Sequence, residues 1–164
     1  MPNFSISTNP TRFRKNFSKK ERTRILSQAE LRLVLTEFQH QPPPFRQFLI
    51  CALLTGILNG ELAKMRWSEI EIGVNASDLN AASNETLNVW NCPAETSKHK
   101  QPVRYVLADD VVKLVVSLPK INSYVFTTGR GVNTHITSQG KVAASIRSKL
   151  AFNDPWTLHD LRRT

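Results

Sequence analysis

The sequence has no long hydrophobic run and contains little cysteine. No segment approaches the roughly 18 uninterrupted apolar residues of a membrane-spanning helix, so we expect no membrane contact. The two cysteines, Cys51 and Cys92, lie far apart without metal-ligand spacing, which argues against a disulfide framework or a cysteine-bound metal. Residues 1–11 lack the apolar core of a secretory signal. We therefore expect a reduced, cytoplasmic protein.

Acidic residues are also few, with 13 Asp and Glu against 22 Lys and Arg, and the net charge is +9. Residues 1–24 carry +6 of this charge, whereas the other 140 residues carry +3. Such a concentration is typical of proteins that bind a polyanion, most often nucleic acid, although a solubilising tail is the alternative. The sequence thus divides into a basic arm, 1–24, and a domain, 25–164. The candidate DNA-binding residues of the arm are Arg12, Arg14, Lys15, Lys19 and Lys20.

Hydrophobic periodicity over residues 25–164 predicts a mainly α, mixed α+β domain. Ser27 and Glu30 form a capping box at the start of the first helix, and Ser138 and Thr157 are expected to cap two later ones. Helices are expected over residues 28–38, 45–56, 61–66, 111–118, 139–150 and from 158 onward. Strands are expected at 86–90, 94–98 and 103–107, with a hairpin turn at 99–102, an extended segment at 124–126 and a loop at 73–85.

The last helix start carries a histidine and an arginine that can bind a phosphate. His159 and Arg162 are spaced i, i+3 and therefore share a helix face. Arginine donates two parallel hydrogen bonds to a phosphate, and histidine donates a hydrogen bond or transfers a proton. Free N–H groups at the helix start would add to this site. The alternative is a solvated polar face of an ordinary surface helix.

Four segments of the sequence can be compared, in their order along the chain, with motifs of a known protein family. They are Ile25–Leu31, Leu53–Ile70, Lys98–Leu107 and Thr157–Thr164. The last, TLHDLRRT, closely resembles the HxxR box of the tyrosine recombinases, the phage integrase family. The second resembles the first box of that family, the third resembles its lysine-bearing β-hairpin, and the first resembles the start of its catalytic domain. The chain is similar to a catalytic domain with a small antiparallel sheet, truncated after the HxxR box so that the C-terminal helices are missing.

The resemblance implies strand exchange on double-stranded DNA through a 3′-phosphotyrosine intermediate. No metal or cofactor is implied, and other recombinase protomers are further candidate partners. Lys98 would be the general acid, His159 a phosphate donor or proton-transfer group, and Arg162 the second arginine of the phosphate clamp. Glu61 would be the acidic residue that orients the site. Clustered cations suit this reaction because the transition state carries negative charge on the phosphate oxygens. A nucleoid-associated protein of a bacterial or phage-infected cell is implied.

Two departures from the family pattern imply that this chain does not cleave DNA. Leu58 stands where the family has its first catalytic arginine, and an aliphatic side chain cannot donate to phosphate; Arg66 is a weaker candidate for that role. The family's tyrosine nucleophile follows the HxxR box, whereas the only tyrosines here, Tyr105 and Tyr124, precede it. Two interpretations stay open. The chain is either an inactive catalytic-domain fragment of an integrase or a DNA-binding or regulatory remnant that pairs with a full-length recombinase.

Deleting residues 1–24 is expected to weaken DNA binding and to flatten its salt dependence, because fewer counterions are released when fewer phosphates are neutralised. The measurement is the dissociation constant for duplex DNA over a series of salt concentrations. Binding that is unchanged by the deletion, or that is insensitive to salt in the whole chain, would exclude this role for the arm.

Overall fold

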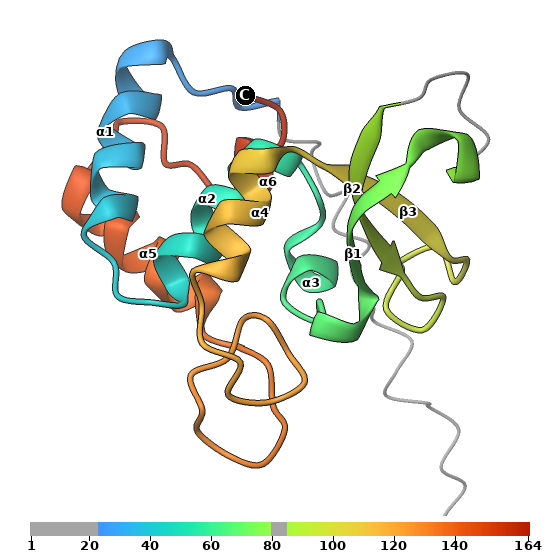
Figure 1. Cartoon of the computed structure of the whole chain (residues 1–164). Helices are drawn as coiled ribbons and strands as arrows, with labels where there is room; N and C mark the ends of the chain where they lie inside the picture. Colours follow the sequence, from blue (N-terminus) through green and yellow to red (C-terminus); the bar gives the residue numbers. More distant parts are fainter. Residues whose placement is uncertain (1–22, 80–84) are drawn as a thin grey trace, which may run out of the picture.

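A computed structural model describes residues 23–79 and 85–164 (Figure 1). The helices are α1 (Gln28–Gln39), α2 (Phe45–Thr55), α3 (Asn59–Leu62), α4 (Asp109–Val116), α5 (Gln139–Leu150) and α6 (Leu158–Leu161). The strands are β1 (Ile70–Asn75), β2 (Thr86–Cys92) and β3 (Val103–Leu107). The predicted DNA-binding residues of the arm lie outside the described residues, so their role stays a prediction.

The fold has a helical side and a sheet side. Figure 1 shows α1, α2, α4, α5 and α6 gathered on one side, the three strands on the other, and α3 between them. The predicted mixed α+β, mainly α class is confirmed. No helix within residues 23–79 and 85–164 is long and apolar enough to cross a lipid bilayer.

Aromatic side chains form the centre of the helical side. Phe38 on α1 packs against Trp156, with ring centroids 6.2 Å apart, and Phe48 on α2 meets Phe126 edge to face at 5.3 Å. All four side chains are fully buried. Burial of these rings brings the segment before α6 onto α1 and the segment after α4 onto α2, because burying aromatic surface is strongly favourable.

The sheet contains one strand that the sequence did not reveal. Its order is β1-β2-β3, and both pairs are antiparallel. The last three residues of β1 overlap the predicted loop at 73–85, so that prediction was wrong for residues 73–75. The pairing of β1 with β2 shifts register between Glu71 and Val74, and Gly73 between them has a φ of 71°. This irregularity interrupts the alternation by which a strand is recognised in sequence.

The predicted strand at 94–98 is also wrong, because these residues form a turn. The N–H groups of Thr96 and Ser97 both donate to the carbonyl oxygen of Pro93 at 3.0 Å, which curls the chain back on itself. The hairpin therefore joins β2 to β3 through residues 93–102, and Lys98 lies within that turn. The helix expected at 61–66 is shorter and displaced: α3 ends at Leu62, and Arg66 instead forms a β-bridge with Tyr124.

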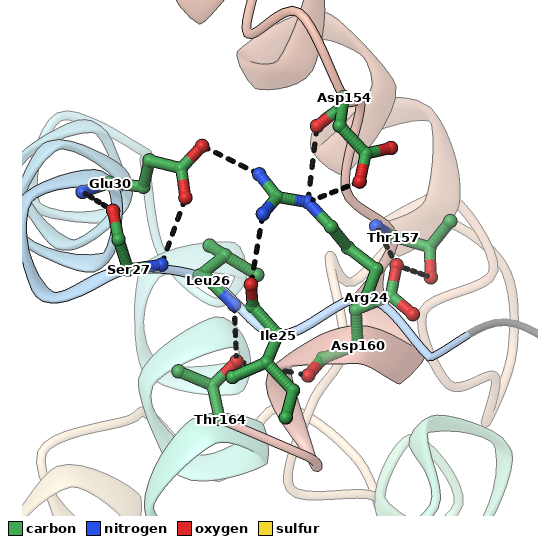
Figure 2. Close-up of polar contacts among 9 residues, drawn as sticks. All are labelled: Arg24, Ile25, Leu26, Ser27, Glu30, Asp154, Thr157, Asp160 and Thr164. Atoms are coloured by element: carbon green, nitrogen blue, oxygen red, sulfur yellow. Dashed lines mark hydrogen bonds and ion pairs between the residues drawn. The ribbon is translucent and has the colours of Figure 1, made fainter.

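The segment before α1 is tied to the segment that leads into α6 (Figure 2). The predicted capping box is confirmed, since Glu30 N–H donates to Ser27 Oγ at 3.3 Å and Ser27 N–H donates to Glu30 Oε2 at 2.9 Å. Arg24 pairs with Glu30 at 2.6 Å and with Asp154 at 3.1 Å. The hydrogen bond from Arg24 lowers the pKa of the Glu30 carboxyl. The positive charge of Arg24 is thus paired with two carboxylates of the folded domain.

A second contact, also drawn in Figure 2, holds α6 to the same segment. Leu26 N–H donates to Thr164 Oγ1 at 3.2 Å, and the Thr164 hydroxyl donates to the carbonyl oxygen of Asp160 at 3.1 Å. Residues that are more than 130 positions apart in the sequence therefore lie side by side. These contacts position the HxxR segment relative to α1.

Candidate functional site

Glu61, on α3, is the best-connected of the candidate site residues. Its side chain is buried, with 4% of the residue exposed. Its Oε1 accepts a hydrogen bond from the backbone N–H of Lys98 at 2.7 Å, and its Oε2 accepts one from the Tyr105 hydroxyl at 3.0 Å. A buried carboxylate needs such donors to offset the loss of water. Glu61 therefore joins α3 to two points of the hairpin, the turn at Lys98 and strand β3.

Lys98 has a constrained backbone and an exposed side chain. The neighbouring Ser97 is buried, and its Oγ accepts from His99 N–H at 3.3 Å. Lys100 N–H donates to the carbonyl oxygen of Ser97 at 3.1 Å, and Lys100 has a φ of 57°. The turn is thus held from inside by Glu61 and Ser97. The Lys98 ammonium is left in solvent, where it can meet an anion.

His159 and Arg162 are both exposed, as their predicted role requires. Thr157 precedes α6 as its N-cap, as predicted, and the buried Asp160 accepts from the Thr157 N–H and hydroxyl, each at 2.8 Å. Since α6 has four residues and the Asp160 carboxylate lies at its start, we assign no phosphate-binding role to the helix end itself. The binding capacity of this segment rests on the two side chains.

Arg162 lies next to the end of α2. Gly56, the C-cap of α2, has a φ of 62°, and a Cβ placed on it would come within 3.6 Å of Arg162 Cγ. Arg162 is also close enough to Tyr105 for its positive charge to act on that phenol. Hydrogen bonds therefore join Glu61 to the Lys98 backbone and to Tyr105, and Arg162 acts on Tyr105 through its charge. His159 lies on α6, three residues before Arg162.

Tyr105 is the residue of this site that no sequence motif indicated. Its ring stacks on Trp90 of β2, with centroids 5.3 Å apart and planes 21° apart. Burial, followed by the hydrogen bond to Glu61, raises the pKa of Tyr105 to about 12. Alternation along β3 could have indicated that Tyr105 points inward, because successive side chains of a strand face opposite sides. In the structure Val103, Tyr105 and Leu107 are less exposed than Arg104 and Val106 between them. The identity of the Tyr105 partner, however, depends on the packing of α3.

Leu58 and Arg66 are the two candidates for the position of the family's first arginine, and neither side chain is bonded to Glu61 or Lys98. Leu58 is the half-buried N-cap of α3 and has no side-chain donor. Arg66 is engaged elsewhere, since its Nη2 donates to the Tyr124 hydroxyl at 3.3 Å and its guanidinium carbon lies 5.1 Å from the centre of that ring. The hydrogen bond to Tyr124 is the main cause that raises the pKa of Arg66. Arg66 therefore has a partner other than the Glu61–Lys98 cluster.

The two cysteines are buried free thiols. Burial raises the pKa of Cys51 to about 12 and that of Cys92 to about 11, which keeps both protonated at neutral pH. Across residues 23–79 and 85–164, no group of three or more His, Cys, Asp and Glu side chains is arranged to hold a metal ion.

Comparison with solved structures gives a tyrosine-recombinase-like fold, as the sequence predicted. The crystal structure of XerA recombinase matches with a TM-score of 0.57 and 18% identity, over 87% of this chain and 48% of that one. XerH site-specific recombinase, in a pre-cleavage complex with difH substrate, matches with a TM-score of 0.57 and 14% identity, over 90% of this chain and 43% of that one. This chain thus spans less than half of either recombinase. No protein-family model and no curated protein sequence matches the chain.

Replacing Tyr105 with phenylalanine is expected to remove part of the loss of stability at alkaline pH. The folded state holds the pKa of Tyr105 at about 12, against an ordinary value of 10.0. The phenol therefore contributes stability that is fully present below about pH 10 and is lost as the pH rises towards 12. The measurement is chemical denaturation between pH 8 and 11.5. Tyr124→Phe is the control, and it should retain the alkaline loss because it keeps Tyr105. An unchanged slope in Tyr105→Phe would contradict the assignment.

Proposed function

We propose that this chain binds the phosphate backbone of double-stranded DNA through a recombinase-type site and does not cleave the DNA. The observation that carries the proposal is the buried Glu61 carboxylate, which joins the turn of Lys98 to α3 and β3. Lys98 and Arg162, from distant parts of the sequence, are both exposed; the Lys98 backbone is bonded to this carboxylate, and the charge of Arg162 acts on the Tyr105 phenol that bonds the same carboxylate. The recombinase-like fold supports the same function.

The chemistry of the exposed side chains suits phosphate oxygens. Arg162 offers a planar fork of N–H donors that matches two phosphate oxygens, and Lys98 offers a compact positive charge. His159 adds a donor on the same face of α6 as Arg162. The basic arm would add sequence-independent affinity, because neutralising phosphates releases counterions from the DNA. XerH, which shares the fold, is bound to its DNA substrate in the solved complex, and this supports DNA as the partner proposed here.

The absence of cleavage follows from the tyrosines and from Leu58. The Tyr105 hydroxyl donates a hydrogen bond to Glu61, and with a pKa of about 12 only about one molecule in 10⁵ would carry the phenolate at pH 7. Among the described residues, Tyr124 is paired with Arg66 rather than with Glu61, Lys98 or Arg162. Leu58 cannot supply the phosphate contact that the family's first arginine makes. We therefore propose that neither tyrosine attacks DNA. The alternative is a non-catalytic DNA-binding or regulatory remnant that pairs with a full-length recombinase.

Arg162→Ala is expected to weaken binding to duplex DNA by about tenfold and to lower the salt-dependence slope by about one, because one charge-assisted phosphate contact is lost. Fluorescence anisotropy with a labelled duplex measures both quantities. Arg163→Ala is the matched control, since it removes the same charge one position along, off the face shared with His159. Equal losses in the two variants would mean that net charge, rather than the face of α6, determines affinity.

Incubation of the whole chain with a nicked suicide DNA substrate is expected to give no covalent protein–DNA adduct. Denaturing gel electrophoresis separates an adduct from DNA that is merely bound. An adduct would contradict the proposal of a non-cleaving protein, and its loss in Tyr105→Phe or Tyr124→Phe would identify the nucleophile.

A further inference from the structure

Tyr105 lies at the centre of the candidate site and has no part in the binding chemistry described above. We propose that Tyr105 is a positioning residue, whose hydroxyl fixes the Glu61 carboxylate and thereby the turn that presents Lys98 to a DNA phosphate. This inference rests on the proposed function, because it assumes that the Lys98 ammonium contacts DNA.

The geometry makes the two hydrogen bonds of Glu61 interdependent. One oxygen accepts from the Lys98 N–H at 2.7 Å and the other from the Tyr105 hydroxyl at 3.0 Å. The terminal torsion of a glutamate is soft, so a carboxylate that is held by one oxygen alone can rotate. With both oxygens engaged, rotation breaks both bonds together. The hydrogen bond from Tyr105 thus limits rotation of the Glu61 carboxylate, whose other oxygen accepts from the Lys98 N–H.

Tyr105 is itself held by the sheet. It is paired with Trp90 across β2 and β3, and the two rings are stacked. The Trp90 indole N–H donates to Glu69 Oε2 at 2.9 Å, which anchors that ring in turn. A continuous series of contacts therefore runs from the sheet through Tyr105 and Glu61 to the backbone of Lys98. Because the lysine side chain is a flexible four-carbon chain, the region that its ammonium group can reach is set by the position of the backbone.

The donor proton of Tyr105 is present at neutral pH. The groups that act on the phenol are Glu61 from α3, Cys92 from β2 and Arg162, the residue that follows α6. Burial and Glu61 raise the pKa of Tyr105 to about 12, and the opposing effect of Arg162 is smaller. The bond to Glu61 therefore forms under the conditions in which DNA binding would be measured.

The first test is amide hydrogen exchange in the DNA-free protein, followed by NMR. Tyr105→Phe keeps the aromatic ring and removes the hydroxyl. Exchange of the Lys98 N–H should accelerate by about tenfold, while the amides that pair β2 with β3 should change by less than about twofold. Tyr124→Phe is the matched control and should leave Lys98 exchange unchanged. Unchanged exchange at Lys98 in Tyr105→Phe, or equal acceleration across the whole sheet, would overturn the positioning role.

The second test is a double-mutant cycle on affinity for duplex DNA. Tyr105→Phe should weaken binding by about threefold in the whole chain and should have no effect in a Lys98→Ala background, because the tyrosine acts only through the lysine. Additive losses would overturn the inference. If the unmodified chain does not bind DNA, the proposed function fails. The exchange measurement then still decides whether Tyr105 positions the turn.

Discussion

Burying a carboxylate is unfavourable unless its oxygens find donors, and at Glu61 both donors come from one hairpin. This requirement links three parts of the chain, because α3 cannot bury Glu61 without the Lys98 turn on one side and Tyr105 on the other. Glu61 thus adds a buried polar link between α3 and the hairpin to the hydrophobic core that the sheet and the helices share. The location of Lys98 is consequently a property of the tertiary structure rather than of the hairpin alone.

A separate set of contacts positions the other half of the candidate site. Arg24 joins Glu30 to Asp154, and Leu26 is bonded to Thr164, so the HxxR segment is held by residues at the start of the fold. Buried Trp156, packed on Phe38, holds the same segment from the inside. Arg162 and Lys98 therefore reach their places by different sets of contacts. Tyr105 bonds Glu61, and its phenol is also within the electrostatic reach of Arg162.

Local sequence signals predicted much of the fold. The Ser27–Glu30 capping box and the Thr157 N-cap are formed as expected, because capping involves residues within three positions of one another. The predictions failed at β1, where a glycine with positive φ and a register shift interrupt the alternation, and at 94–98, where Pro93 begins a turn. At the site, the resemblance to the recombinase boxes indicated Glu61, Lys98, His159 and Arg162 but not Tyr105, whose importance arises from a partner 44 positions away.

The sequence by itself determined the caps of α1 and α6, the fold class, the identity of the cationic side chains and the neutral residue at position 58. These features depend on residue type and on short-range spacing, which the chain carries before it folds. Only the tertiary structure decided that Glu61 bonds the Lys98 turn, that Tyr105 completes this bond, and that Arg66 is engaged with Tyr124. Such pairings depend on which distant segments come together to bury apolar surface, and no local pattern specifies that choice.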